Sequence, residues 1–344
     1  MGHRTGVTRG SADTQDRNDW PGSPHEAARF ILDKLPGCHA VEGAPPTDER
    51  FHHGDDTPVL LPPELLEGES FAAIRVADPR SPRIQSGFAA FLDGTQEVRV
   101  VNQAYGIPIV WATVSAAIRA RVNRRLIAWK GSAPIVSRRY YIPFRYVDGL
   151  DDDMRANPRI VDTAKPDAAG NAPSRHPAAL MEAAVQKVQQ DREAIELQLA
   201  ESWCKTESSA LYVDGSISGS AIASSSPLAV GVVKSHRRLY ADGDAFHILV
   251  ALDSGERSTA FKVSPRGRHP VASWYVRIRA ATGRDALFGL VRVEAALGPD
   301  ISRRANEISR WIIAEGAPLA LPDGRWDKMA YGIRDTEEFL RAIS

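Results

Sequence analysis

The sequence predicts a mixed α/β fold: a central mixed sheet flanked by helices and preceded by an irregular N-terminal arm. Three observations predict this fold class. Apolar, strand-like segments begin near residue 86, one long amphipathic helix occupies the middle of the chain, and further strand-like segments lead to two closing helices. This order of elements is typical of proteins built on one central sheet with helices packed against it.

The composition is that of a globular protein without an overall charge. The 344 residues suffice for one large domain with additions or for two ordinary domains, and 43% are hydrophobic and 25% charged. Basic and acidic residues number 43 each, so no global field directs the protein to nucleic acid or membranes, although a local basic surface is compatible with this balance.

The use of cysteine and the length of the apolar stretches bear on the cellular compartment of the protein. Cys38 and Cys204 lack metal-ligand spacing, which favours a reducing environment. The N-terminus has no apolar core like that of a signal peptide, and no apolar stretch reaches the roughly 20 residues of a membrane helix. We therefore expect a cytoplasmic protein.

The first part of the chain, residues 1–84, is predicted to be a disordered tail followed by an irregular arm. Residues 1 to about 25 are rich in Gly, Ser, Asp and Arg. A short amphipathic helix is expected at residues 25–35, and several prolines and glycines follow between residues 36 and 63.

The first β region opens a predicted domain over residues 85–344. The segments "GFAAFLDG", "EVRVV" and "IPIVWATVSAAIRARV" read as strands, and Tyr105-Gly106 marks a hairpin between the last two. "RRLIAWKG" and "RRYYIPFRYV" could continue the sheet. Residues 148–177 hold many prolines and aspartates with little apolar periodicity, so we expect a loop there, within an insertion near residues 133–177.

The longest helix is predicted from about Pro177 to Lys205, where apolar residues recur at helical spacing. The strand "ALYVD" follows directly. "PLAVGVVKSHRRLY", "AFHILVALD", "STAFKV", "SWYVRIRA" and "LFGLVRVEAAL" are expected to supply further strands. "DISRRANEISRWIIAEG" and "RWDKMAYGIRDTEEFLRAI" are the two closing helices.

Two strands end in aspartate, glycine and a hydroxyl residue, at Asp93 and at Asp214. One Asp-Gly pair is most often a turn, because both residues tolerate a positive φ. Two such strands that are neighbours in a sheet would instead bring their carboxylates together. Repulsion between two carboxylates is commonly resolved by a divalent cation with oxygen ligands, such as magnesium or manganese.

A third carboxylate, Glu196, lies on the long helix at the rim of its apolar face, while Glu193 lies farther round and is expected to be solvated. Glu196 precedes Asp214 by 18 residues, which is enough chain to return to the same sheet edge. An ordinary helix-surface charge is the alternative interpretation. Strand aspartate, helix glutamate and strand aspartate is the carboxylate order of ribonuclease H-like nucleases.

The chain resembles the NurA family of DNA-end-processing nucleases, which have a ribonuclease H-like core. The resemblance covers about residues 85–344, with residues 133–177 fitting poorly. The stretches that carry it are "FLDGT", "DREAIELQLAESW", "LYVDGSIS", "LAVGVVKSHRR", "SWYVRIR", "LVRVEAAL" and "EGAPLALPDGRWDKMAYGIRDTEEFLRAI".

The resemblance implies a metal-dependent nuclease that processes DNA ends in repair, with manganese or magnesium, two ions, held by Asp93, Glu196 and Asp214. It also implies a HerA-type hexameric ATPase as partner and a homodimer. Lys234 is expected to meet a phosphate oxygen, with a solvent-edge lysine as the alternative reading.

The chain departs from the family near its C-terminus, where Ala317-Pro318 and Ala330-Tyr331 stand in place of a Tyr-Pro pair and an Ala-His pair. Tyr331 can hydrogen-bond a phosphate but is no imidazole ligand. Asp323 or Asp327 could substitute for the histidine, although a solvated aspartate at the start of a helix is the favoured interpretation of both. A non-catalytic or weakly active module that binds DNA ends or docks the ATPase is therefore the alternative function, and an unrelated α/β binding protein is a third.

Basic clusters are candidates for contact with the DNA backbone, with solvated faces as the alternative. They comprise Arg237 and Arg238; Arg119, Arg121, Arg124 and Arg125; and Arg266 and Arg268. Two other motifs carry little. "FHHGDD", residues 51–56, lies in the proline-rich arm, and "GSISGS" lacks both a phosphate-loop ending and the serine of a nucleophile elbow.

Overall fold

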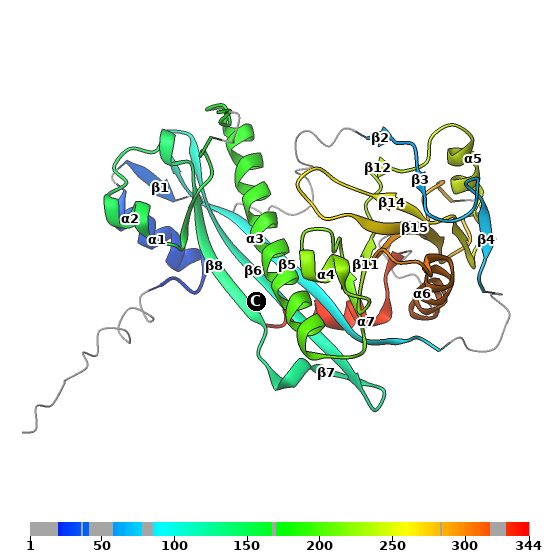
Figure 1. The fold of residues 1–344 in the computed structure, drawn as a ribbon. Helices are drawn as coiled ribbons and strands as arrows, with labels where there is room; N and C mark the ends of the chain where they lie inside the picture. The colour runs from blue at the N-terminus through cyan, green and yellow to red at the C-terminus, as the bar shows by residue number, and fades with distance from the viewer. Residues whose placement is uncertain are drawn as a thin grey trace, which may run out of the picture. The chain divides into compact units, whose positions relative to one another are not determined.

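The computed structural model describes residues 20–35, 37–40, 58–77, 85–166, 170–282, 284–316 and 328–343. Its fold is mixed α/β, as the sequence predicts (Figure 1). The chain forms two compact units. The smaller comprises Met1–Phe51, Glu97–Thr113 and Arg138–Lys187, and the larger comprises His52–Gln96, Val114–Ser137 and Val188–Ser344. The expected division at residue 84 therefore does not follow a unit boundary.

The larger unit contains a mixed sheet with the strand order β3-β14-β15-β16-β11-β10-β5-β6. These strands are β3 (Glu64–Leu65), β14 (Phe261–Val263), β15 (Val271–Arg277), β16 (Leu290–Ala295), β11 (Ala229–Val233), β10 (Ala210–Asp214), β5 (Phe88–Ala104) and β6 (Ile107–Val122). β10 pairs in parallel with both β5 and β11, whereas β16 pairs antiparallel with β11 and β15. Parallel neighbours bring the same ends of their strands together.

Shorter strands extend this sheet or pair beside it. β13 (Glu256–Ser258) pairs with β15 and with β4 (Ala73–Arg75), and β7 (Arg125–Ala128) pairs with β6 and leads into the 3-10 turn η1 (Trp129–Gly131). β12 (Arg238–Leu239) and β2 (Val59–Leu60) form a separate two-stranded ribbon.

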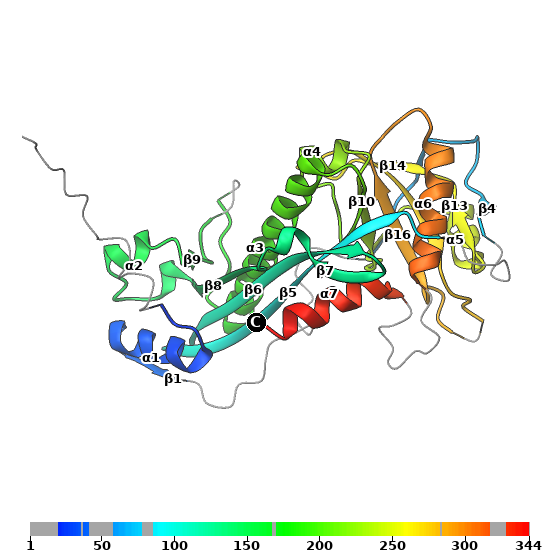
Figure 2. The same ribbon diagram turned by 90° about the horizontal axis from the view of Figure 1, so that it is seen from below.

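Helices cover both faces of this sheet. Along β10, Leu211 and Val213 pack into one apolar cluster and Tyr212 into another, because successive strand side chains point to opposite faces. The first cluster includes residues of α3 (Pro177–Thr206), α4 (Ala221–Ser225) and α5 (Asp244–Ala251). The second includes residues of α6 (Ile301–Glu315) and α7 (Tyr331–Arg341), and Figure 2 shows α7 and α4 on opposite sides of β5. We call these the α3 face and the α7 face.

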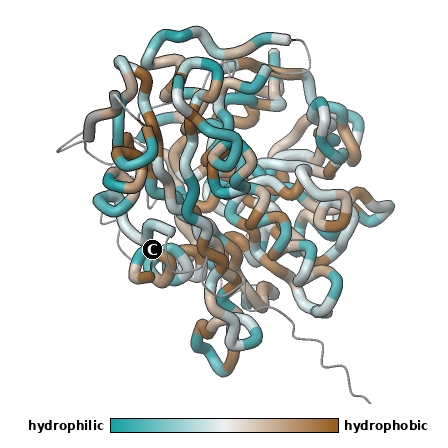
Figure 3. Tube along the Cα trace, turned by 90° about the vertical axis from the view of Figure 1, so that its left-hand side faces the viewer, coloured by the Kyte–Doolittle hydropathy of each residue, from teal (hydrophilic) through white to brown (hydrophobic). Residues whose placement is uncertain are grey.

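The smaller unit packs α1 (Pro24–Lys34) onto the far halves of β5 and β6. Its other elements are β1 (Cys38–Ala40), β8 (Ile135–Ile142), η2 (Phe144–Tyr146), α2 (Asp152–Ala156), β9 (Ile160–Asp162) and the first turns of α3. Ile31, Trp111 and Tyr140 belong to its apolar cluster, and the Tyr140 hydroxyl donates to the Ala27 carbonyl at 2.6 Å. Hydrophobic and hydrophilic stretches alternate along the trace in Figure 3, as expected for strands buried by such clusters.

The loop insertion expected near 133–177 is wrong, because this stretch holds β8, α2 and β9. The strand expected at "RRYYIPFRYV" is confirmed by β8, which continues the sheet beside β6. Tyr140 and Ile142 are buried where β8 pairs with β9, and the exposed Asp151 caps α2 by accepting from the Met154 N–H at 2.7 Å. The many prolines obscured these short elements. The predicted strand "AFHILVALD" is also wrong: it forms α5, whose residues Ala245 and Leu249 are buried one helical turn apart.

Several predictions are confirmed. The long helix ends one residue later than expected, at Thr206, and the closing helices are α6 and α7. β5 and β6 form a hairpin whose turn residues Tyr105 and Gly106 both have a positive φ. No helix among the described residues is long and apolar enough to cross a membrane.

Candidate functional site

Asp93 and Asp214 lie side by side on neighbouring parallel strands. β5 and β10 pair in a register that sets Leu92 opposite Val213, so the next residue on each strand is an aspartate. Phe91 and Tyr212, two residues earlier, belong to the cluster on the α7 face, and side-chain alternation assigns both aspartates to that face. The prediction that these strands are neighbours is therefore correct.

The prediction that both aspartates end strands is only half correct. Asp214 is the last residue of β10, but β5 continues through Asp93 and Gly94 to Ala104. Gly94 does not have a positive φ, and the Gly94 N–H donates to Asp93 Oδ1 at 2.8 Å. The first Asp-Gly pair is thus part of an extended strand, because β5 keeps its pairing with β6 beyond it.

Lys234 forms an ion pair with Asp214 on the α7 face. It follows β11, and its Nζ lies 2.7 Å from Asp214 Oδ2 and 3.9 Å from Met329 Sδ. Burial alone would lower the pKa of Lys234, but the carboxylates of Asp214 and Asp93 outweigh this effect, so its pKa is raised. The sequence led us to expect this ammonium at a phosphate, whereas here it neutralises an aspartate.

Glu196 approaches the same strand from the α3 face. It is buried, and its Oε1 occupies the space that a side chain at Gly94 would fill. Arg192, one helical turn earlier, donates from Nη1 to the Gly94 carbonyl at 3.3 Å, and its Nε lies 3.6 Å from Glu196 Oε1. This oxygen accepts no hydrogen bond from protein although it is buried. A glycine beside Asp93 is therefore what lets the helix carboxylate reach the strand.

The three carboxyl groups influence one another electrostatically. Burial raises the pKa of Asp93 well above its usual range, and the Asp214 carboxylate raises it further; Lys234 opposes the shift and Glu196 adds to it. Burial likewise raises the pKa of Glu196 to about 7, opposed by Arg192 and supported by Asp214. Like charges and loss of hydration both disfavour the ionised forms. The structure therefore brings the three predicted residues into one carboxylate centre.

This centre is not a complete ligand sphere. Within the described part of the chain, no group of three or more histidine, cysteine, aspartate or glutamate side chains is arranged to hold a metal ion. The geometry gives the reason: the two aspartates lie on the α7 face with an ammonium, while the glutamate comes from the α3 face. Ion binding to all three carboxylates would therefore need the side chains to rearrange.

Sequence reasoning missed the residues that support the centre. Glu294 on β16 is buried and accepts from Ser216 Oγ at 2.8 Å and from the Ile217 N–H at 3.0 Å, which holds the turn after Asp214. A Cβ at Gly231 would lie 2.7 Å from the Gly215 carbonyl oxygen. The turn after Asp214 can therefore pass this close to β11 only because residue 231 is a glycine. A lone glutamate inside the apolar run "LVRVEA" was the signal that could have identified Glu294.

Residues predicted to bind DNA have different surroundings. Arg119 pairs with Asp335 at 2.9 Å, Arg121 with Glu315 at 2.8 Å, and Arg268 with Glu193, the glutamate that we expected to be solvated. The side chain of Arg237 is partly buried and that of Arg238 exposed. The first three arginines are therefore engaged with acidic side chains of the same chain.

Tyr331, which we expected to contact a phosphate, begins α7 and is 67% exposed. The next residue, Gly332, packs so closely on the Phe91 ring that a side chain there would overlap it. This contact holds the start of α7 near the aspartate pair. Residues 51–56, Ala317-Pro318, Asp323 and Asp327 lie outside the described residues.

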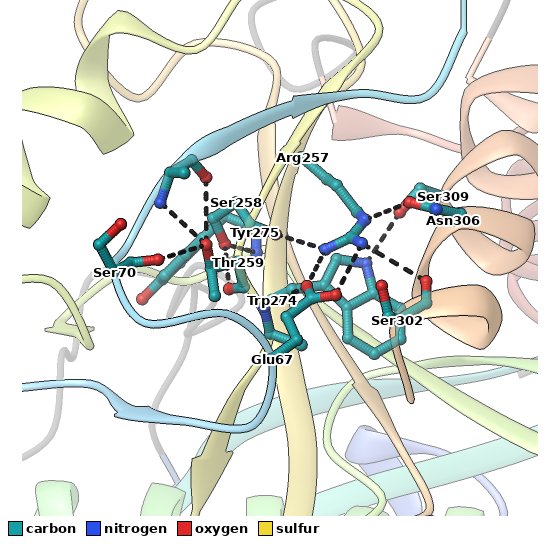
Figure 4. A network of polar contacts seen from close by, with 12 residues as sticks. Glu67, Ser70, Arg257, Ser258, Thr259, Trp274, Tyr275, Ser302, Asn306 and Ser309 are labelled. Carbon is teal, nitrogen blue, oxygen red and sulfur yellow. Dashed lines mark hydrogen bonds and ion pairs between the residues drawn. The ribbon is translucent and has the colours of Figure 1, made fainter. Parts of the chain in front are cut away.

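A second charged group in the larger unit, the buried Arg257 with the partly buried Glu67, serves as a contrast (Figure 4). Arg257 is fully buried and donates to both Glu67 oxygens, to Asn306 Oδ1 at 2.7 Å and to the Ser258 carbonyl at 2.8 Å. Glu67 also accepts from the Ala260 N–H at 2.7 Å. Both members of this pair are hydrogen-bonded within the protein, as expected of a structural ion pair.

Comparison with known proteins adds no relative to this picture. No protein-family model matches the chain, and no curated protein is significantly similar to it in sequence.

Proposed function

We propose that this chain is a metal-dependent phosphodiesterase of the NurA type that processes DNA ends. The observation that carries the proposal is the carboxylate centre: Asp93 and Asp214 in register on adjacent strands, with the buried Glu196 against Gly94. Buried carboxylates with raised pKa values cost stability, and such groups cluster at functional sites. A ribonuclease H-like core fits the order in which these carboxylates occur along the chain.

The residues of the centre suit a divalent cation. All three offer carboxylate oxygens, the ligands preferred by manganese and magnesium, and Glu196 Oε1 is buried without a donor. Asp93, Glu196 and Asp214 would hold the ion. When bound, it would supply an activated water and neutralise charge on the scissile phosphate.

The chain's own groups would do the rest. Arg192 orients the Glu196 carboxylate through its contact with the Gly94 carbonyl. Lys234 supplies positive charge beside the aspartates, and the exposed Tyr331 could hydrogen-bond a phosphate oxygen. Arg237 and Arg238 follow Lys234 and would contact the DNA backbone. The family resemblance adds a HerA-type ATPase and a homodimer as proposed partners.

The second candidate is a non-catalytic or weakly active module that binds DNA ends or docks the ATPase. Two observations favour it: an ammonium already occupies Asp214, and tyrosine stands where the family has histidine. A module of this kind would keep its DNA affinity in the absence of divalent ions.

Nuclease assays with manganese separate the two candidates. We expect the wild-type protein to degrade linear DNA, and Asp93→Asn and Asp214→Asn to lower the rate by about a thousandfold, since removing one group of a catalytic set commonly costs several kcal/mol. Asp253→Asn, which changes an exposed aspartate of the larger unit, is the matched control. DNA-end binding in EDTA without any cleavage in manganese would support the second candidate. A protein that showed no DNA binding and no cleavage would contradict both candidates.

A further inference from the structure

The β6–β7 hairpin carries an arginine in its turn. Val122 pairs with Arg125, which leaves a two-residue turn between them. The turn residues Asn123 and Arg124 both have a positive φ. Turns of this type favour asparagine followed by glycine, because both central residues lie in the left-handed region. Asn123 fits this preference, whereas Arg124 stands where glycine is favoured. The backbone of the turn therefore does not explain this arginine, and its side chain is the feature to account for.

One face of the hairpin is fastened to the larger unit. Arg119 Nε lies 2.9 Å from Asp335 Oδ1 of α7. Arg121 Nη2 lies 2.8 Å from Glu315 Oε1 of α6. Leu126, on the returning strand, packs against the apolar cluster of the α7 face. These contacts fix the base of the hairpin, and they use its first two arginines within the protein.

The other face and the turn are exposed. Val122 and Ile127 are 45% and 47% exposed, and strand alternation places them on one face with Arg125. Arg124 and Arg125 are exposed too, and within the part of the chain that the structure describes neither side chain pairs with an acidic group. In Figure 1 the turn lies below α4 and α7. The tip of the hairpin therefore presents two arginines and an apolar pair to a partner.

The charge and the shape of the hairpin together indicate the partner. No aspartate or glutamate occurs between Glu97 and Asp148, a stretch that includes the whole hairpin, although acidic and basic residues balance over the chain. A projecting basic tip attracts a polyanion. The major groove of B-DNA, about 12 Å wide, admits a two-stranded β-ribbon, and apolar side chains there contact thymine methyl groups. Duplex DNA accounts for both the charge and the ribbon, whereas an acidic peptide accounts for the charge alone.

We propose that the β6–β7 hairpin binds in the major groove of duplex DNA, with Arg124 and Arg125 contacting the phosphates. This inference rests on the proposed function and deepens it, because it makes duplex DNA the substrate that the chain holds. Phosphate contacts position a protein on DNA but carry no sequence information, so the grip is expected to be largely independent of sequence. The hairpin acts in binding and not in the chemical step, and it needs no divalent ion.

Affinity for DNA in EDTA tests the inference without cleavage. Fluorescence anisotropy measures Kd for a blunt duplex of about 20 base pairs, two helical turns, and for a single strand of the same length. Arg124→Gly is the sharpest variant, because it gives the turn its favoured glycine and should leave the melting temperature unchanged or raised. We expect it to weaken duplex binding about tenfold and to reduce the slope of log Kd against log salt by about one, as loss of one phosphate contact does. Single-strand affinity should stay unchanged.

Arg303→Gln is the matched control, because it removes one positive charge from an α6 arginine that is 74% exposed. It should alter neither the duplex affinity nor the salt slope. If Arg124→Gly disturbs the fold, Arg124→Gln gives the same comparison without changing the turn to glycine.

Unchanged duplex affinity in the Arg124 variants would overturn the inference and leave a partner protein as the occupant of the hairpin. An equal loss on single strands would also overturn it, because a groove would then not be needed. In either case a wild-type protein that still cleaves DNA in manganese keeps the proposed function. A wild-type protein that binds no DNA and cleaves none would reject the proposed function, and this inference with it.

Discussion

The carboxylate centre and the Glu67–Arg257 pair are two acidic sites of the larger unit that are shielded from solvent, the second only in part at Glu67, and the pKa values of their carboxyl groups shift in opposite directions. Burial alone would raise the pKa of Glu67, but hydrogen bonds from Arg257, Ser302 and the Ala260 N–H outweigh it, and the pKa is lowered. In the carboxylate centre, burial and like charges act together, and the pKa values of Asp93 and Glu196 are raised.

This difference between the two sites shows how a charged residue that stabilises the fold can be distinguished from one that is available to a ligand. Glu67 is matched by a cation and by several donors, so its charge stabilises the fold. The carboxylate centre has more acid than base and leaves a buried oxygen without a donor. An imbalance of this kind is expected where a ligand, rather than the protein, completes the site.

The largest predicted effect concerns the structural pair. Arg257→Met should lower the free energy of unfolding by about 2–4 kcal/mol, because it removes a fully buried guanidinium and leaves the partly buried Glu67 carboxylate without its cation. Urea unfolding measures the change. Arg75→Met is the control, since Arg75 pairs with Glu256 at the surface and should contribute no more than about 1 kcal/mol. Equal losses in the two variants would remove the distinction between the sites.

The turn after Asp214 gives the next effect. Gly231→Ala should lower the free energy of unfolding by about 1–3 kcal/mol, because its new methyl group would meet the Gly215 backbone and the strand or turn must shift. The same shift should weaken manganese binding, since it moves Asp214. Gly298→Ala, where a side chain meets nothing within 4 Å, should change neither property. Loss of stability without loss of ion binding would show that the turn does not position the centre.

A gain of stability is expected at the carboxylate centre itself. Asp93→Asn should raise the free energy of unfolding in EDTA by about 1–2 kcal/mol, because it removes a buried like charge and keeps an oxygen for the Gly94 N–H. The same variant should no longer take up manganese. Asp335→Asn, which breaks an ion pair with Arg119, should instead be neutral or destabilising. A destabilised Asp93→Asn would mean that the centre is as well matched as the structural pair.

The smallest effect is a pH dependence from His236. Burial, together with the charge of Lys328, lowers the pKa of His236 from 6.5 to about 4, although Nε2 lies 2.7 Å from the Leu290 carbonyl oxygen. The unfolded chain takes up a proton below pH 6.5 while the folded protein stays neutral, so stability is full above pH 6.5 and falls as pH drops toward 4.

Between pH 7 and pH 5.5, this titration should cost about 1 kcal/mol. Unfolding of the wild-type protein and of His236→Gln at both pH values measures it as the difference in pH dependence between them. An identical pH dependence in both would exclude His236 as the cause.

Local patterns predicted the elements around the site well. Apolar spacing predicted α3 to within a residue at its end, and Tyr105-Gly106 predicted the β5–β6 hairpin. Composition was less informative at α5, where a run of Val, Ile and Leu suits either a strand or a buried helix. The choice there depends on packing against the sheet, which has no local signature.

The sequence predicted the three carboxylates of the site but not the residues that hold them in place. Asp93 and Asp214 are unusual in their own apolar segments, and Glu196 was singled out only by its place at the rim of the apolar face of its helix. Arg192 and Glu294 are ordinary charged residues of a helix and a strand, and their roles arise only where those elements meet the aspartate strands.

What the sequence alone determined is therefore local: the helix and strand periods, the hairpin turn, and three acidic residues in a suggestive order. Only the tertiary structure decided that β5 runs on past Asp93, that both aspartates share one face, that Glu196 enters from the other through Gly94, and that Lys234 binds Asp214. The physical reason is that strand pairing, burial and charge neutralisation depend on contacts between residues distant in the chain, and these exist only once the chain has folded.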